Sequence, residues 1–468
     1  MEIVLLKTDF LLFVLLGLIA CYWRYAATRA HLSAPWGQVA ERPMAMAAAV
    51  VLATFLIVAL LDSMHFHPRV ADSDAGQARY SSQIKSVLDV VLTPIKNDEK
   101  TYSAPLAAHS FAKETIEGPD GSAVRDYPRL VHGASHLKDL DSHRRDVIAR
   151  TLGGVLAGLL AWAALAAIAV ALLAKRAELD FKNLLRQIMR GESSVPWRVI
   201  LGAVAVIFAL IGFVATVGPY YHILGTDKVG ADVLYQGIKS VRTGLLIGTL
   251  TTLVMLPFAI VMGVAAGYFR GWVDDAIQYL YTTLSSIPGI LLIAAAALML
   301  EAYMNTHADD FANLAARADV RLLAICMILG VTTWTGLCRL LRGETLKLRE
   351  IEYIQAASAF GIQHSVILAR HIVPNIMHII MISIVLDFSG LVLAEAVLTY
   401  VNIGVDPSME SWGNMINSAR LELARDPAVW WSLVTAVTFM FTLVLAANIF
   451  ADAVRDAFDP RLREMRAS

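Results

Sequence analysis

Three polar residues lie within stretches that are otherwise apolar. Asp387 and Glu395 fall in the stretch 376–400, and Asn448 lies near the end of the stretch 428–450. Charged and amide groups are costly in lipid, so they often mark a polar path or a bond between helices. Eight residues make just over two helical turns, which places Asp387 and Glu395 on roughly one face. We treat all three as candidates to line a polar path through a membrane, with hydrogen bonding to neighbouring helices as the alternative.

A second candidate site is the polar loop 352–375, which reads EYIQAASAFGIQHSVILARHIVPN. Residues 354–360 favour a helix, and Gly361 permits a turn that a residue with a Cβ would resist. Residues 366–371 can form a second short helix, which Pro374 is expected to stop. The sequence therefore predicts a compact helical hairpin outside the lipid.

Histidine and cysteine spacing does not predict a metal site. Three histidines are spaced by seven residues, namely His364, His371 and His378. Pro374 interrupts the helix that would align them. The pair His65 and His67 has no third ligand at fixed spacing. The cysteines Cys21, Cys326 and Cys338 lie in or beside apolar stretches and are expected to be inert thiols.

The composition predicts an all-α integral membrane protein. Of 468 residues, 57% are hydrophobic and only 17% are charged, against roughly 25% charged residues in soluble proteins. The mean hydropathy is +0.59. A net charge of -1, from 39 basic and 40 acidic residues, argues against a nucleic-acid-binding protein.

Apolar stretches long enough to cross a bilayer predict nine spans. A span needs about 20 predominantly apolar residues. The stretches are 44–61, 151–174, 199–218, 243–267, 277–300, 321–338, 376–400 and 428–450, and 10–23 is a shorter ninth. Without it the count is eight. A cleaved signal peptide is the alternative for the N-terminus, but the chain begins Met1-Glu2 instead of with a basic region.

Clusters of Lys and Arg set the expected orientation, because positive loops stay in the cytoplasm. The loops 24–43, 175–198 and 339–375 are the basic ones, and the tail from Ala451 is also basic. Alternation of the spans then places the N-terminus and 62–150 outside. The loop 352–375 and the C-terminus are expected in the cytoplasm.

The domain organisation follows from these spans. We expect two N-terminal spans in 1–61, an external insert in 62–150, a third span with a basic cytoplasmic linker in 151–198, and a six-span core in 199–468 whose cytoplasmic loop is 342–375. The insert is near neutral and rich in Pro, Gly, Asp and Ser, which predicts a small, loop-rich cap and not an independent enzyme domain.

One weak internal repeat links the insert to the core. The segments 136–147 and 222–233 share a His, two Asp residues and a Val in the same register, and each leads into a span that contains glycine. Chance agreement and partial duplication are both compatible with four matches in twelve positions.

The loop and several other motifs resemble the permease subunits of bacterial ATP-binding-cassette importers. In that family Glu-Ala-Ala is followed after three residues by Gly, and a Pro lies thirteen residues beyond. Ala356, Ala357, Gly361 and Pro374 match that spacing. The ending from Arg370 to Asn375 is similar to the dipeptide, oligopeptide and nickel branch.

Further motifs extend the resemblance over about 199–468. They are Gly225-Thr226-Asp227 with Gly230 and Asp232-Val233, Gly267-Tyr268-Phe269, Gly271-Trp272-Val273-Asp274, Ser286-Ile287-Pro288, Glu395-Ala396, Ser411-Trp412-Gly413-Asn414, and Arg455-Asp456 with Asp459-Pro460-Arg461. Their common order along the chain makes the resemblance specific. The first 198 residues have no counterpart in the six-span core of the family.

The resemblance implies a transport subunit of the bacterial inner membrane and not an enzyme. Family members transport peptides or peptide-like solutes in this branch, pair with a second, different permease chain, and receive substrate from an external binding protein. Two ATPase subunits or domains dock on the cytoplasmic loop. The residues expected to couple to them are Glu352, Tyr353, Gln355, Ala356, Ala357, Gly361, Arg370 and Pro374. Asp387, Glu395 and Asn448 become candidates for the translocation path.

The absence of an ATP-binding motif agrees with a partner subunit that supplies the energy for transport. The sequence has no G-x-x-x-x-G-K-[ST] loop, so ATP is expected to be hydrolysed by partner subunits, and no cofactor is expected on this chain. Two departures from the family pattern stand out. Gln355 replaces the usual Glu, and Gly230-Ala231-Asp232 lacks the usual Arg. An ion-coupled secondary transporter is the alternative, although it would need an ion-binding cluster near the midplane.

Overall fold

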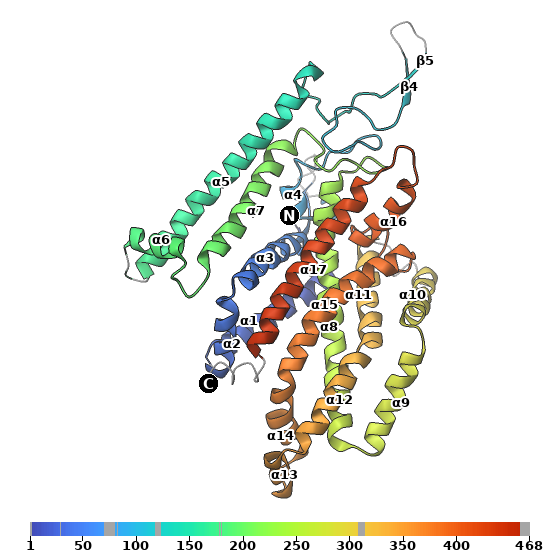
Figure 1. Ribbon diagram of the computed structural model, residues 1–468. Coiled ribbons are helices and arrows are strands. Elements are labelled where there is room, and N and C mark those ends of the chain that lie inside the picture. Colours follow the sequence, from blue (N-terminus) through green and yellow to red (C-terminus); the bar gives the residue numbers. More distant parts are fainter. Residues whose placement is uncertain are drawn as a thin grey trace. The chain divides into compact units, whose positions relative to one another are not determined.

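The computed structural model describes residues 2–28, 30–69, 80–81, 83–117, 123–176, 178, 180–307 and 314–458. These residues form mainly α-helices with a few short strands (Figure 1). Internal contacts divide the chain into two compact units. The first unit comprises 1–4, 37–243 and 410–446, and the second unit comprises 5–36, 244–409 and 447–468.

The first unit holds the predicted insert and the helices around it. Its helices are α3 (Pro43–Ser63), α4 (Val87–Val91), α5 (His143–Arg176), α6 (Phe181–Arg190), α7 (Trp197–Val217), the start of α8 (Val233–Phe269), α16 (Trp412–Glu422) and most of α17 (Trp431–Phe458). A short 3-10 helix, η1 (Leu140–Ser142), precedes α5.

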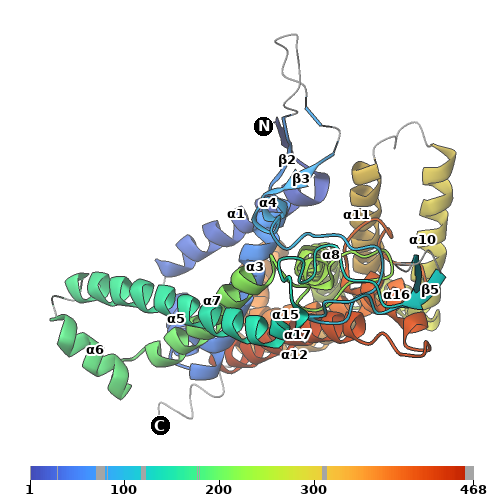
Figure 2. The same ribbon diagram turned by 90° about the horizontal axis from the view of Figure 1, so that it is seen from above.

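Helices α5 and α7 pack side by side as an antiparallel pair (Figures 1 and 2). Glycine makes the close approach possible. A Cβ on Gly154 would lie 2.5 Å from the carbonyl oxygen of Gly212, and one on Gly158 would lie 2.1 Å from that of Phe208. Small residues four apart are typical of helix packing in lipid, where backbone contact replaces the hydrophobic effect. Thr216 adds a hydrogen bond to the carbonyl of Arg150 (3.1 Å).

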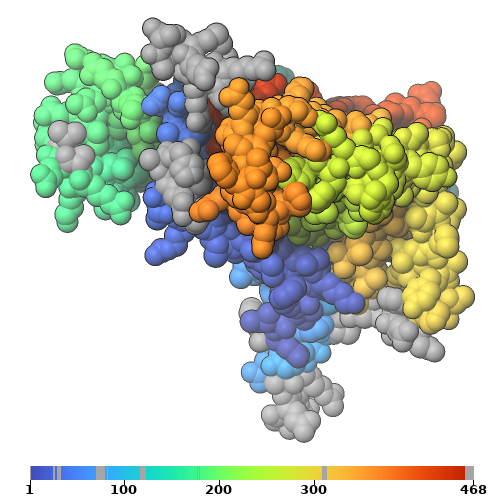
Figure 3. Space-filling model, turned by 90° about the horizontal axis from the view of Figure 1, so that it is seen from below, coloured from blue at the N-terminus to red at the C-terminus, as the bar shows by residue number. Residues whose placement is uncertain are grey.

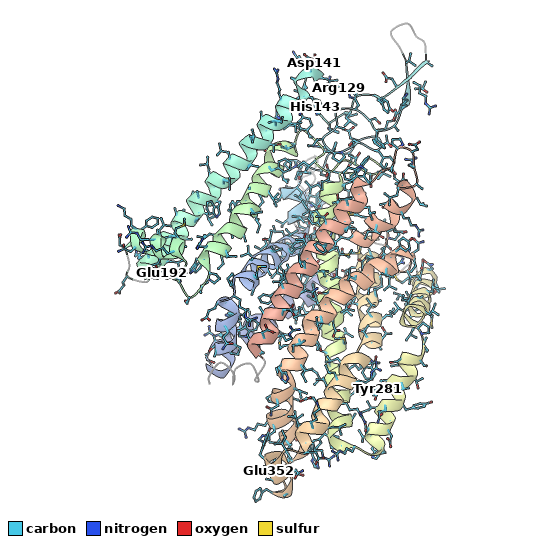
Figure 4. The ribbon with its side chains drawn as sticks, in the orientation of Figure 1. Arg129, Asp141, His143, Glu192, Tyr281 and Glu352 are labelled. Carbon is cyan, nitrogen blue, oxygen red and sulfur yellow. The ribbon has the colours of Figure 1, made fainter. Side chains whose placement is uncertain are left out.

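The insert is loop-rich, as predicted. Its strands are β2 (His65–His67), β3 (Lys85–Ser86), β4 (Glu114–Glu117) and β5 (Ala123–Asp126). Strand β2 pairs antiparallel with β3 and with β1 (Glu2–Val4), while β4 and β5 form a separate antiparallel pair. Apart from α4, η1 and the start of α5, the other described residues of the insert are turns and loops, and hydrogen bonds hold them, for example between His143 Nε2 and the carbonyl of Leu106 (3.0 Å; His143 is labelled in Figure 4).

The second unit contains most of the predicted core. Its helices are α1 (Lys7–Ala27), part of α2 (Ala30–Ala40), the rest of α8, α9 (Trp272–Ser286), α10 (Gly289–Thr306), α11 (Leu314–Thr333), α12 (Thr335–Arg349), α13 (Glu352–Ala359), α14 (His364–Ile367), the π-helical segment η3 (Leu368–Ile372), α15 (Val373–Tyr400) and the end of α17. A buried apolar cluster from α8, α12 and α15 forms its interior.

Seven helices among the described residues are long and apolar enough, by length and composition alone, to cross a membrane, whereas the sequence predicts nine spans. Six predicted spans each coincide with one such helix: 44–61, 151–174, 199–218, 243–267, 376–400 and 428–450. The predicted span 277–300 is wrong as a single helix, because the chain is extended at Ile287 and Pro288 caps α10. Only α10 belongs to the seven.

The remaining two predicted spans are helical but are not among the seven. The stretch 321–338 is divided between α11 and α12, and α11 carries three charged residues in its first half, namely Arg317, Asp319 and Arg321. The stretch 10–23 lies within α1, a helix of 21 residues. At about 1.5 Å per residue, α1 is long enough to span hydrocarbon about 30 Å thick.

Candidate functional site

The loop 352–375 forms the predicted helical hairpin. Helix α13 ends at Ala359, and Gly361 makes the turn with a φ of +75°. Such a left-handed backbone favours glycine because a Cβ would be strained there. Helix α14 and the π-helical segment η3 then lead into α15. The two short helices and the glycine turn are therefore confirmed.

Pro374 does not stop the second helix, which corrects the prediction. Residues 364–400 run as one continuous helical stretch. Proline lacks an N–H and clashes with the preceding turn of a regular α-helix. Here the preceding turn is π-helical, with the N–H of Val373 bonded to the carbonyl of Leu368, and Pro374 lies in the first turn of α15. The wider turn accommodates the proline, as such bulges do in other helices.

Apolar side chains fix the inner face of the hairpin to the second unit. Ile354, Ala357 and Ile367 are buried in the same cluster as Leu337 and Leu341 of α12. Ala357 therefore packs inside its own chain, and its contact with another protein stays a prediction. Its neighbour Ala356 remains exposed. On a helix, adjacent residues point about 100° apart, which explains the difference.

Polar contacts brace the base of the hairpin. The hydroxyl of Tyr268, at the end of α8, lies 2.8 Å from Nδ1 of His364. Arg349 donates from Nη1 to the backbone carbonyl of Tyr268 at 2.5 Å. Arg342 on α12 binds both carboxylate oxygens of Asp274 on α9, at 2.5 and 2.7 Å. These bonds tie α8, α9, α12 and α14 together at one end of the bundle.

The outer face of the hairpin is exposed and carries several large apolar side chains among polar ones. Phe360 is 86% exposed, and Tyr353, Ile362 and Val366 are also exposed. Figure 3 shows the hairpin, in orange, at the surface of this end of the second unit, and Figure 4 labels Glu352, the first residue of α13. Four large exposed apolar side chains within one short hairpin mark an interaction site more often than scattered single residues do.

The other predicted coupling residues lie at or near this surface. Tyr353 accepts a hydrogen bond from Nδ2 of Asn375 at 3.0 Å. Gln355 donates from Nε2 to the side chain of Glu350 at 3.2 Å, and Glu350 also pairs with Arg270. Three residues, Glu352, Arg370 and Pro374, are exposed. A Glu at position 355, as in the family pattern, would therefore place its carboxylate beside that of Glu350.

The three polar residues within the spans have different surroundings. Glu395 is buried and accepts a hydrogen bond from Thr399 at 2.9 Å. Asn448 on α17 accepts one from Ser389 on α15 at 2.8 Å. Asp387 is only half-buried. The hydrogen bonds of Glu395 and Asn448 thus join these two side chains to hydroxyl groups of α15.

A buried charged cluster in the first unit was missed by the reasoning from sequence. His222 lies between Asp232, 2.8 Å from Nδ1, and Glu99, 3.3 Å from Nε2. All three side chains are nearly inaccessible to solvent. Glu99 also accepts backbone N–H groups from Val131, His132 and Gly133 at 2.8 to 2.9 Å.

The weak internal repeat was the sequence signal that could have indicated this cluster. His136 and Asp146 occupy the positions of His222 and Asp232 in the repeat. In this second pair Nε2 of the His also lies 2.8 Å from Oδ2 of the Asp. In both segments the His and Asp are ten residues apart and the Asp lies near the start of a long helix. The repeated pattern therefore corresponds to a repeated contact.

Backbone pairing joins the insert to the segment before α8. Glu99 donates its backbone N–H to the carbonyl of Gly230 at 2.9 Å, and the backbones of Thr226 and Ser103 bond at 3.1 Å. Two glycines with positive φ permit this approach. A Cβ on Gly230 would lie 1.8 Å from the carbonyl oxygen of Glu99, and one on Gly225 would lie 2.4 Å from that of Ser103.

The cluster shifts the pKa of two of its members, His222 and Glu99. Burial lowers the pKa of His222, but hydrogen bonds with Asp232 and Glu99 outweigh it and raise that pKa to about 9. Burial raises the pKa of Glu99, but hydrogen bonds from His222 and three backbone N–H groups lower it to about 2. Near neutral pH His222 is therefore an imidazolium beside the carboxylate of Glu99.

Comparison with known proteins covers the second half of the chain. Residues 259–464 match the family of binding-protein-dependent transport system inner membrane components. The glutathione transport system permease protein GsiD of Pectobacterium atrosepticum is 31% identical over 245 residues, which are 52% of this chain and 73% of that protein. The oligopeptide transport system permease protein OppC of Mycobacterium bovis is 28% identical over 245 residues, with 52% and 78% covered.

A more distant likeness exists among solved structures. A chain from the study of inward-facing conformations of the MetNI methionine ABC transporter is 16% identical, with a TM-score of 0.37 over 48% of this chain and 97% of that chain. The identity and coverage of the permease relatives decide the assignment. The chain belongs to the binding-protein-dependent transport system inner membrane components, the permease subunits of ATP-binding-cassette importers.

Proposed function

We propose that this permease forms half of a translocation path for peptides or peptide-like solutes, and that ATPase subunits drive it through the hairpin 352–374. The relatives named above transport oligopeptides and glutathione, which supports a substrate of this chemical class. The other half of the path is a second, different permease chain, and an external binding protein delivers the substrate. ATP binds to the partner subunits and not to this chain.

The observation that carries the coupling role is the contrast between the two faces of the hairpin. Its inner face is fixed by Ile354, Ala357 and Ile367, while Phe360 and Tyr353 on the outer face have large exposed surfaces. A partner that binds the outer face would move the hairpin and α15 together, since η3 joins them without a break. Rigid-body motion of this kind is one way that transport proteins switch between states.

The proposed orientation places this hairpin in the cytoplasm and the insert outside. Positive residues support it, because the basic segments 175–198 and 339–375 fall on one side when the four predicted spans 199–218, 243–267, 277–300 and 321–338 lie between them. The C-terminus lies on the same side as the hairpin in this arrangement, and the chain resides in the bacterial inner membrane.

Among the polar residues of the spans, Asp387 is the strongest candidate for the path. Its carboxylate is half-buried, whereas Glu395 bonds Thr399 and Asn448 bonds Ser389 inside the second unit. We therefore assign Asp387 to the path, and Glu395 and Asn448 to the support of the helices that form it. Asp387→Asn should change uptake without loss of assembled complex, while Asn448→Ala should lower the yield of folded protein.

Phe360→Ser tests the coupling role directly. The variant keeps the inner face of the hairpin intact, so it should insert and fold normally but lose the ATPase in mild detergent and lose uptake. Leu421→Ser is a matched control, because Leu421 is also highly exposed but lies on α16. Normal ATPase recovery and uptake with Phe360→Ser would refute the docking role of this surface.

A further inference from the structure

Helix α6 has two distinct faces that its own chain leaves exposed. Phe181, Leu185 and Met189 are exposed apolar residues spaced by four. The basic residues Lys182, Arg186 and Arg190 follow each of them by one position and are exposed as well. At about 100° per residue, each set forms a stripe along the helix, and the two stripes lie next to each other.

A third face attaches α6 to the rest of the first unit. Ile188 is 1% exposed, and α6 contacts both α5 and α7. The helix ends at Gly191, whose φ of +73° turns the chain toward α7. A Cβ on Gly191 would lie 3.5 Å from Nη1 of Arg198, so a cation lies near the helix C-terminus, where it is electrostatically favourable. The helix is therefore fixed in place and not a free tail.

The position of α6 relative to two spans places it at a membrane surface. Helices α5 and α7 are both long and apolar enough to cross a bilayer, and α6 lies in the short connection between them. Figure 1 shows it beside the ends of both helices, and Figure 4 labels Glu192 just beyond it. An apolar stripe at this depth can enter the acyl boundary while the adjacent basic stripe meets the headgroups.

We propose that α6 is an interfacial helix that binds anionic phospholipid headgroups through Lys182, Arg186 and Arg190. The charge of the connection supports this occupant, because 175–198 carries six basic and three acidic residues. Arg190 lies 3.9 Å from Glu192, a contact between two largely exposed side chains that leaves its guanidinium accessible. Phosphate groups at the membrane surface complement this basic stripe, and the neighbouring apolar stripe sets its depth.

The test uses the full chain in mild detergent with equal amounts of phosphatidylglycerol and phosphatidylcholine, and native mass spectrometry of the retained lipids. The wild type should retain phosphatidylglycerol preferentially. Replacement of Lys182, Arg186 and Arg190 by Gln should lower that preference at least about tenfold, since each basic residue near an anionic surface changes affinity severalfold. High salt should reduce the wild-type preference in the same direction.

A matched control variant removes the same number of positive charges from another part of the chain. Lys138, Arg144 and Arg145 are also one lysine and two arginines, all exposed, around the opposite end of α5. Their replacement by Gln should leave the preference near the wild-type value. An equal loss in both variants, or no loss in either, would overturn the proposal.

Hydrogen exchange supplies a readout of depth. Amides of α6 should exchange more slowly in nanodiscs that contain phosphatidylglycerol than in nanodiscs of phosphatidylcholine alone. Met189→Ser removes an apolar side chain that is 67% exposed. The amides of α6 in this variant should exchange faster than those of the wild type in both kinds of nanodisc. If lipid composition has no effect and exchange slows only when ATPase subunits are added, α6 binds a protein instead and the lipid proposal fails.

Discussion

Nδ1 of His222 lies 2.8 Å from a carboxylate oxygen of Asp232, in the segment just before α8. Glu99 of the insert approaches the other ring nitrogen, so one imidazolium connects the insert to this segment. The pKa of His222 is raised to about 9, above its ordinary value of 6.5. Its contribution to stability is therefore complete below about pH 6.5 and is lost as the pH rises through 9.

The first prediction is a pH-dependent difference between wild type and His222→Gln. Removal of the cation leaves two buried carboxylates without it, which should cost on the order of 3 kcal/mol near pH 6.5. Thermal unfolding in detergent from pH 6.5 to 9.5 should show the two proteins converging as the pH rises. His132→Gln is the control, because its exposed side chain leaves the backbone bond to Glu99 in place. A constant gap across this range would contradict the role of His222.

A second prediction compares two glycines that share a positive φ but differ in their surroundings. Gly230 and Gly361 have φ values of +81° and +75°. A Cβ at Gly230 would collide with the backbone of Glu99, whereas nothing lies within 4 Å of one at Gly361. Gly361→Ala should therefore cost only backbone strain, about 1 kcal/mol. Gly230→Ala should separate the insert from the segment before α8.

Limited proteolysis distinguishes these outcomes. Cleavage within 96–111 should accelerate in Gly230→Ala and stay at the wild-type rate in Gly361→Ala. Equal rates in the two variants would mean that the insert is not held by this backbone contact. Deletion of 1–190 should likewise destabilise the segment before α8, since that segment would lose the backbone and side-chain partners that surround His222.

The third prediction concerns the residue that departs from the family pattern. Gln355 donates a hydrogen bond to Glu350, which also pairs with Arg270. Gln355→Glu would place a second carboxylate at this exposed position, with a cost below about 1 kcal/mol. We expect normal expression and a weaker local contact, while Gln355→Glu combined with Glu350→Gln should restore it. Hydrogen exchange of α13 measures the difference, and an identical rate in single and double variants would argue against this contact.

Local rules predicted the hairpin well. The glycine turn, the helix before it and the helix after it follow from residues that are close in sequence, where Gly361 requires a left-handed backbone. The π-helical turn before Pro374 was not predictable in this way, because it depends on how α15 continues into the bundle. The break at Ile287 was missed because the apolar run continues across it, and hydropathy alone cannot distinguish one helix from two.

Long-range contacts account for the rest of what the sequence did not reveal. Nothing near Glu99 in the sequence indicates that it pairs with His222, more than a hundred residues away. Ala356 and Ala357 are identical in type, and only the packing of α13 on α12 shows that one is buried. The insert was therefore predicted correctly as loop-rich, but its close association with the segment before α8 was not.

The fourth prediction tests orientation. Cys21 is exposed while Cys326 and Cys338 are buried, so Cys21→Ser gives a background with little reactivity. In that background Val124→Cys, on exposed strand β5, should react with a membrane-impermeant thiol reagent in intact cells. Ser358→Cys, on the exposed face of α13, should react only after permeabilisation. The opposite pattern would reverse the proposed topology.

The last prediction separates folding of the hairpin from docking on it. Ala357 is buried against α12, so Ala357→Glu would place a charge without a partner in an apolar cluster, at a cost of roughly 3–5 kcal/mol. Its neighbour Ala356 is exposed on the same helix, so Ala356→Glu should leave the hairpin folded. Hydrogen exchange of α13 should accelerate in the first variant and remain unchanged in the second. ATPase recovery in mild detergent should fall in both, by local unfolding for Ala357→Glu and by direct interference for Ala356→Glu. Full recovery with Ala356→Glu would place the docking contact on Phe360 and Tyr353 alone, and full recovery with both variants would remove the hairpin from the coupling mechanism.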